Sequence, residues 1–302
     1  MKYLLIIICS ITLSKSYGQN ADEYFRIDNA KFEKNDYEGS VSGFSQVIKL
    51  DSLNVEAFIF RAMSKVFLMD YEGAIEDFTR VIAIDPKESL AYFSRGMLRK
   101  GFGDNEAAIA DFTSAISVSD SFSLAYLNRG KARFDMQDNE GALHDINRSI
   151  EISPGDVQAL TSRAFVKRVM KDYAGSVIDY DKAITINPLD ASLYNERAVT
   201  KALLHDSAGT IADYNKAIHL DPQYAEAYIN RGLFLSTGED YEAAIADFNK
   251  AIEILPRSAE AYVHRGFARL MNNDKAGGCA DFCKAVELGE NYAIKLIKEY
   301  CE

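Results

Sequence analysis

The chain has 302 residues, of which 48% are hydrophobic and 26% charged, a composition that supports a large buried core and excludes an intrinsically disordered protein. Its 45 acidic and 34 basic side chains give a net charge of −11, which argues against a nucleic-acid-binding protein. Only four Cys and four His are present, so neither a dense disulfide framework nor a multi-histidine metal site is expected, and the low count of five Pro favours helix.

Residues 1–18 are predicted to form a signal peptide. A short basic start precedes an apolar run from Tyr3 to Leu13, which is too short to span a bilayer as a helix. Small polar residues follow this run, and cleavage is expected after Gly18. The alternative is lipid attachment to Cys9, which the three Ile residues before it disfavour because lipoprotein processing needs a small residue there. We therefore expect an exported protein, periplasmic or secreted, without a lipid anchor.

Beyond residue 18 the sequence repeats with a period of 34 residues. All five Pro occupy one phase of the period, and Asp occupies another phase eight times without a gap. We therefore expect residues 19–292 to hold eight tandem repeats without insertion or deletion. The repeats are 21–54, 55–88, 89–122, 123–156, 157–190, 191–224, 225–258 and 259–292. The invariant Asp are Asp36, Asp70, Asp104, Asp138, Asp172, Asp206, Asp240 and Asp274.

Each repeat is predicted to fold as two helices. In the repeat 225–258, apolar residues recur at helical spacing over 225–238 and again over 240–255. Asp240 is placed to cap the amino end of the second helix, and Pro256 ends it because Pro cannot continue the backbone hydrogen-bond ladder. Small residues at fixed phases, such as Gly232, are expected where the paired helices approach closely.

This pattern resembles the tetratricopeptide repeat, through the residues Tyr228, Gly232, Tyr241, Ala244, Phe248, Ala251 and Pro256 and their counterparts in the other repeats. The resemblance implies an all-α fold of an exported bacterial type: a right-handed superhelical solenoid of eight helix-turn-helix repeats with a C-terminal capping helix over 293–302. The position of the family's Trp holds Tyr, Phe or Leu throughout. The first repeat carries Ile27, Asp28 and Gly43 where the others carry Arg, a small residue and Asp, as expected of an end repeat.

Two charged ladders recur in the second to eighth repeats, sixteen residues apart. An anion-binding stripe is one interpretation of the arginines. Because the helices of every repeat must pack in the same way, residues that recur unchanged from repeat to repeat are expected to be structural. We therefore predict part-buried, bidentate Arg–Asp pairs instead. The ladders are Arg61, Arg95, Arg129, Arg163, Arg197, Arg231 and Arg265, and Asp77, Asp111, Asp145, Asp179, Asp213, Asp247 and Asp281.

The resemblance places a partner-binding groove on the concave face lined by the first helices. The residues at the corresponding positions form an apolar stripe with polar side chains among them, which suits a peptide or an amphipathic helix. The alternative is that several of them, above all at the fifth position of the helix, are core residues. The predicted groove residues are Met63, Phe93, Met97, Lys100, Leu127, Asn128, Phe134, Phe165, Arg168, Val199, Ile229, Asn230, Leu233, His264 and Phe267.

The cysteines give one further prediction. Cys279 falls where other repeats place Ile or Val facing the next helix, and the capping helix ends at Cys301. A Cys279–Cys301 disulfide that holds the cap, with Cys283 free, is one hypothesis, and three thiols without a bridge is the other.

The sequence predicts a non-enzymatic scaffold or adaptor that binds a peptide or partner protein, with no catalytic residues, cofactor or metal. The four His lie in four different repeats, and neither a phosphate-binding Gly loop nor a nucleophile elbow is found. No nucleic-acid partner and no stable membrane span are expected. The alternatives are a recruitment subunit of an envelope-assembly or secretion complex and a solenoid that binds polysaccharide or small ligands. An enzyme is a more distant alternative, because the repeats and the cap account for all the residues after 18.

Overall fold

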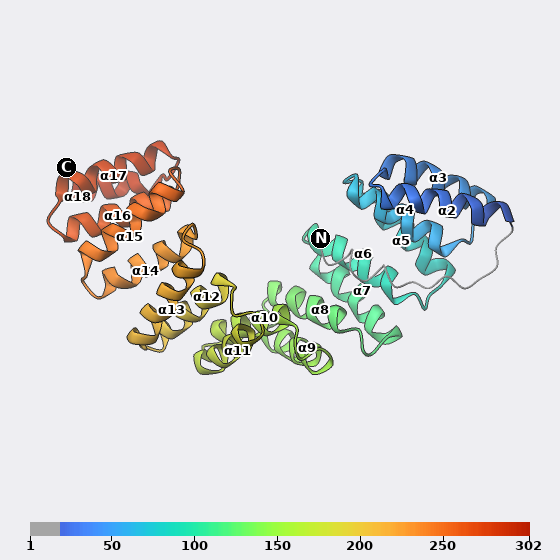
Figure 1. Ribbon diagram of the computed structural model, residues 1–302, viewed down its shortest axis with the longest axis horizontal. Coiled ribbons are helices and arrows are strands. Elements are labelled where there is room, and N and C mark those ends of the chain that lie inside the picture. The colour runs from blue at the N-terminus through green and yellow to red at the C-terminus, as the bar shows by residue number, and fades with distance from the viewer. Residues whose placement is uncertain (1–18) are drawn as a thin grey trace. The chain divides into compact units, whose positions relative to one another are not determined.

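The computed structural model describes residues 19–302, in which seventeen helices follow one another and no strand occurs (Figure 1). The all-α prediction is confirmed. The helices fall into two compact units that divide at Pro154, and each unit is described by itself below. The predicted signal peptide and Cys9 lie outside the described residues.

The helices alternate between the first and the second helix of successive repeats, and within each compact unit every first helix packs against its own second helix. The unit that ends at Pro154 holds α2 (Gln19–Glu33), α3 (Tyr37–Leu50), α4 (Val55–Phe67), α5 (Tyr71–Ile84), α6 (Ser89–Gly101), α7 (Asn105–Val118), α8 (Ser123–Asp135) and α9 (Asn139–Ile152). The unit that begins at Gly155 holds α10 (Val157–Val169), α11 (Tyr173–Ile186), α12 (Ala191–Leu203), α13 (Ser207–Leu220), α14 (Ala225–Thr237), α15 (Tyr241–Ile254), α16 (Ala259–Met271), α17 (Lys275–Glu287) and α18 (Tyr292–Tyr300).

The turn between the two helices of a repeat has one geometry throughout. The invariant Asp caps the second helix: Asp70 Oδ1, for example, accepts from the backbone N–H of Gly73 at 3.0 Å. The residue before each Asp adopts the left-handed conformation, and the Asp70 N–H bonds back to the Lys65 carbonyl at 2.9 Å, which closes the end of α4. The left-handed residues are Asn35, Met69, Gly103, Gln137, Lys171, His205, Glu239 and Asn273.

Small residues allow the paired helices to touch. A Cβ atom added to Gly232 in α14 would lie 2.8 Å from the ring of Phe248 in α15, closer than real Cβ contacts allow. Phe248 is fully buried, as are its counterparts Phe78, Phe112 and Phe282. The missing side chain on one helix therefore makes room for the ring on the other, and this complementarity forms the core of each repeat.

The C-terminal helix α18 closes the last repeat. Its residues Ala293 and Leu296 are buried in a cluster with Val263 and Phe282, while Ile297 and Tyr300 are half-buried. A disulfide joins Cys279 in α17 to Cys301 at the end of α18, with a Cα–Cα distance of 5.8 Å. Cys283 is a free, exposed thiol.

Loss of this disulfide is expected to release the cap. Closing a chain segment of 22 residues stabilises a fold by about 3 kcal/mol in the chain-entropy estimate, so Cys301→Ser should lower the free energy of unfolding by about that amount. Hydrogen exchange of the amides in 292–300 should accelerate most, because α18 lies at the end of the array. The matched control is Cys283→Ser, which should change neither quantity, and an unchanged exchange rate in Cys301→Ser would contradict the role given to the bridge.

Candidate functional site

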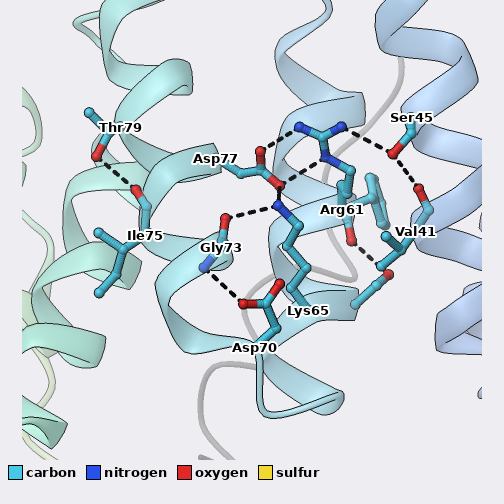
Figure 2. A network of polar contacts seen from close by, with 11 residues as sticks. Val41, Ser45, Arg61, Lys65, Asp70, Gly73, Ile75, Asp77 and Thr79 are labelled. Carbon is cyan, nitrogen blue, oxygen red and sulfur yellow. Dashed lines mark hydrogen bonds and ion pairs between the residues drawn. The ribbon is translucent and has the colours of Figure 1, made fainter.

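The Arg and Asp ladders form ion pairs between the two helices of a repeat (Figure 2). Arg61 Nε donates to Asp77 Oδ2 at 2.9 Å, and Arg61 Nη2 donates to Asp77 Oδ1 at 2.6 Å, so the contact is bidentate. Asp77 is only 3% exposed. The pairing removes the carboxylate charge from solvent and satisfies both of its oxygens.

Arg61 makes two further contacts beyond this pair. Arg61 Nη1 donates to the Ser45 hydroxyl at 3.1 Å, which lies on the second helix of the preceding repeat. Its guanidinium carbon also lies 5.3 Å from the centre of the Phe58 ring, three residues earlier on α4. One side chain thus connects three helices and covers a ring.

The same arrangement recurs along the chain. Bidentate bonds join Arg95 to Asp111, Arg129 to Asp145, Arg163 to Asp179, Arg197 to Asp213, Arg231 to Asp247 and Arg265 to Asp281. Because the arginines are engaged with the protein in this way, the ladder offers no stripe for a soluble anion.

A second cation completes the pair in almost every repeat. The Lys65 ammonium lies 2.8 Å from Asp77 Oδ2. The position of Lys65 in the repeat holds Lys or Arg in every other repeat except one. The exception is Leu235, so Asp247 has Arg231 as its only ion-pair partner among the described residues. Leu235 therefore removes a charge at one place in an otherwise regular ladder.

The first repeat carries the same carboxylate on the opposite helix. Asp28 on α2 is buried and lies 2.8 Å from the Lys31 ammonium, whereas Gly43 on α3 stands where the other repeats have Asp. A Cβ atom on Gly43 would lie 1.9 Å from the Asp28 carboxyl group, so the carboxylate of α2 occupies the space that the α3 side chain has left. The Asp and the small residue have exchanged helices.

Five predicted groove residues lie in the core instead. They sit on the side of the first helix that faces the neighbouring helices, where apolar side chains are driven from water, so they present no surface to a partner. The prediction that they bind a partner is wrong, and the core alternative holds for them. They are Met63, Phe93, Leu127, Ile229 and Val263, each at most 8% exposed.

The other predicted groove residues keep some exposed surface. Phe165 is 41% exposed, and the rest are half-buried. In the first compact unit, the Lys100 ammonium pairs with Asp135, and Asn128 Nδ2 bonds to the Leu124 carbonyl of its own helix. The half-buried set is Met97, Lys100, Asn128, Phe134, Arg168, Val199, Asn230, Leu233, His264 and Phe267.

In the unit 155–302, the first helices carry a connected polar network. Asn230 Nδ2 of α14 donates to Asn195 Oδ1 of α12 at 3.1 Å, and Asn195 Nδ2 donates to the Tyr224 hydroxyl at 3.4 Å. The Tyr224 hydroxyl in turn donates to Glu226 Oε2 at 3.4 Å. Sequence reasoning identified Asn230 and missed Asn195 and Tyr224, which only the fold brings together.

An ion pair lies on the neighbouring helices. Arg168 Nη1 of α10 lies 2.9 Å from Glu196 Oε2 of α12, and the Arg168 guanidinium covers the Phe165 ring at 5.2 Å. Burial, followed by the negative charge of Glu196, raises the pKa of the Tyr180 hydroxyl, and the same two causes raise the pKa of Tyr214. Both phenols therefore stay protonated at neutral pH and remain hydrogen-bond donors.

The described residues show no arrangement for metal-dependent chemistry. Within 19–302, no three His, Cys, Asp or Glu side chains are grouped to hold a metal ion. Burial lowers the pKa of His264, and the nearby Glu260 carboxylate, 3.7 Å away, only partly opposes this, so the imidazole is neutral at pH 7. None of the helices α2–α18 has the length and apolar content that crossing a bilayer requires.

The repeated helix pairs and their ion-pair ladder define an all-α helical-repeat protein. Residues 90–122 match the family model described as "Tetratricopeptide repeat", and residues 234–273 match the one described as "TPR repeat". A comparison with the curated proteins found no match. The chain therefore contains tetratricopeptide repeats, and its all-α solenoid fold is the one that such repeats build.

Solved structures share the fold at low sequence identity. A tetratricopeptide repeat protein from Parabacteroides merdae has a TM-score of 0.63 and 19% identity, with 83% of this chain and 99% of that chain covered. For the Cut9–Hcn1 hetero-tetramer of the APC/C the TM-score is 0.60 and the identity 13%, with 98% and 58% covered. Yeast Tom70 has a TM-score of 0.58 and 17% identity, with 96% and 66% covered.

The missing second cation predicts an unequal response to loss of the ladder arginines. Arg231→Ala leaves Asp247 buried without an ion-pair partner and should lower the free energy of unfolding by about 3–5 kcal/mol. Arg197→Ala leaves Lys201 at 2.8 Å from Asp213 and should cost about 2 kcal/mol. Urea denaturation followed by circular dichroism measures both. Equal losses would contradict the assigned role of the second cation.

The exchange of residues in the first repeat predicts strong coupling between positions 28 and 43. Gly43→Asp alone places a second carboxylate against Asp28 and should cost about 3 kcal/mol. Adding Asp28→Gly restores one carboxylate beside Lys31 and should recover most of the loss. A double-mutant cycle measures the coupling, and additive losses in the two single variants would show that the two sites do not share one space.

Proposed function

We propose that this protein is a non-enzymatic adaptor that binds a peptide or a partner protein on the faces of its first helices. In residues 155–302 this surface consists of exposed or half-buried side chains on α10, α12, α14 and α16. The observation that carries the proposal is that these first helices bear a partly exposed ring, Phe165 on α10, and a half-buried amide, Asn230 on α14, which the buried Asn195 holds through a hydrogen bond. Accessible rings and amides can bind the apolar side chains and the backbone of an extended chain, respectively.

The remaining observations are consistent with a scaffold. The charged ladders are engaged in holding the helices, and the described residues group no side chains for metal chemistry. A chain of the same fold occurs in the Cut9–Hcn1 hetero-tetramer, an assembly of two proteins. Such repeats generally serve as interaction scaffolds, which is the coarse function that the family supports.

The place of action is part of the proposal. The sequence of residues 1–18 supports export, so we propose that the partner is met in the periplasm or outside the cell. A recruitment subunit of an envelope-assembly or secretion complex is the more specific form of the same function.

Substitution of the exposed ring tests the proposal. Phe165→Asp should reduce partner recovery at least tenfold in a pull-down from an extract of the producing cells, because a charge replaces the apolar contact. The matched control is Ile178→Asp on the second helix α11, where an apolar side chain is 53% exposed away from this surface. If Phe165→Asp keeps the wild-type partners, or if Ile178→Asp loses them equally, the first helices are not the binding surface.

A further inference from the structure

The repeats differ most informatively at the junction between the sixth and the seventh repeat. The first residue of the second helix is Tyr in four repeats: Tyr37, Tyr71, Tyr173 and Tyr241. In the sixth repeat this residue is Ser207, and the seventh repeat carries Leu235 where the others carry a cation. Leu235 departs from a position that otherwise always holds a cation, whereas Ser207 stands at a position that is Tyr in four repeats and Asn or Lys in the other three.

In the first compact unit, aromatic rings fill two junctions of this type. Tyr37 stacks on Phe67 of the next repeat with ring centres 4.2 Å apart, and Tyr71 meets Phe102 of its next repeat at 5.9 Å. The residues at the positions of Phe67 and Phe102 are Thr237 and Gly238 in the seventh repeat. Three small residues therefore replace a pair of rings.

An open pocket of about 830 Å³ lies at this junction. It lies between α12, α13 and α14, and Ser207, Thr237 and Gly238 all line it. The apolar part of its wall comes from residues of all three helices, and Asn230 of the polar network lines it as well. The larger apolar residues are Val199, Leu203, Ile211, Leu233, Phe234 and Leu235.

Acidic groups without a cation lie at the same place. In the fourth and eighth repeats, the arginine at the position of Leu235 also lies near the helix-capping Asp, as Arg269 lies 3.8 Å from Asp274. Leu235 cannot do this for Asp240, which lines the pocket. Glu239 precedes Asp240, and like Asp240 and Asp206 it has no ion-pair partner among the residues that the structure describes.

We propose that this pocket receives an apolar side chain of a peptide segment whose neighbouring residues are Lys or Arg. The inference rests on the proposed function and specifies the partner. The side chain is a large apolar one such as Leu, Phe or Met, because the pocket wall is mostly apolar and the pocket volume exceeds that of one aromatic ring. The basic neighbours meet Asp240, which lines the pocket, and the adjacent acidic residues Glu239 and Asp206, none of which has an ion-pair partner among the described residues; His205 also lines the pocket. A peptide with acidic residues at these places would be repelled by the carboxylates.

The experiment uses synthetic peptides with the full chain. Each fluorescent dodecapeptide consists of Ser and Gly with one Phe or Leu and two Lys, and the peptides differ in the spacing between the apolar residue and the two Lys. Fluorescence anisotropy measures their binding. Matched peptides replace the apolar residue by Ser, or both Lys by Glu. At least one apolar-basic peptide should bind tenfold more tightly than both matched versions. If no apolar-basic peptide does so, the inference is overturned.

Two variants place the binding in the pocket. Ser207→Tyr introduces the residue that four other repeats have and should weaken that peptide at least tenfold, and Thr237→Phe serves as a second filling variant. Asp240→Asn keeps a good helix cap and should weaken binding about threefold, with the difference lost at high salt. The controls are Asn105→Tyr and Asp104→Asn, at the same positions of the third repeat, and both should bind as wild type.

The outcomes separate this inference from the broader function. If the filling variants melt as wild type and still bind the peptide, the pocket is not the site and the inference fails. If the peptides fail while Phe165→Asp still abolishes partner recovery, the adaptor function stands and only the pocket assignment is lost. If the controls weaken binding as much as the pocket variants do, the location is wrong.

Discussion

The buried ion pair between an arginine of the first helix and an aspartate of the second is the contact on which the rest of the structure depends. A carboxylate that is only a few per cent exposed is costly to bury unless it is fully paired, and here two guanidinium bonds and usually a second cation satisfy it. Since the same arginine reaches the preceding repeat, as Arg61 reaches Ser45, the pair also fixes how one repeat follows the next. The charged residues thus fix how the helices are arranged, and the apolar residues fill the space between the helices.

The first repeat shows that a carboxylate must fill the space between the two helices of the repeat, whichever of the two helices carries it. Asp28 and Gly43 reverse the usual order of small and acidic residues, and the carboxylate still lies beside a lysine. Its Oδ2 atom has no hydrogen-bond partner among the described residues, which follows from the absence of the arginine, since Ile27 stands at that position.

Features that are constant along the period could be predicted from the sequence. The invariant Asp caps and the partners within each Arg–Asp pair follow from residues that recur at a fixed spacing. The third partner of the arginine could not be predicted, because Ser45, Thr79 and Asn215 share only the ability to accept a hydrogen bond. The left-handed turn residues gave no signal either, since Gly103 is the single Gly among eight.

The proposed binding surface was the hardest part to predict. A residue such as Phe93 or Leu127 fits both a groove and a core by its spacing, and only the packing of neighbouring helices decides between them. The pocket had a visible signal in Leu235, which departs from the cation of the other repeats, but its convergence with Ser207 depends on the fold.

The open junction also affects how the array unfolds. In a repeat protein, stability is close to a sum over repeats and their interfaces, so cooperativity is only as strong as the weakest interface. Within residues 155–302, α13 and α14 pack together less closely than the other successive helices do. The chain therefore has a seam where the repeats on either side can separate before either unfolds. An occupant that spans α12, α13 and α14 would close this seam and join the two parts into one cooperative body.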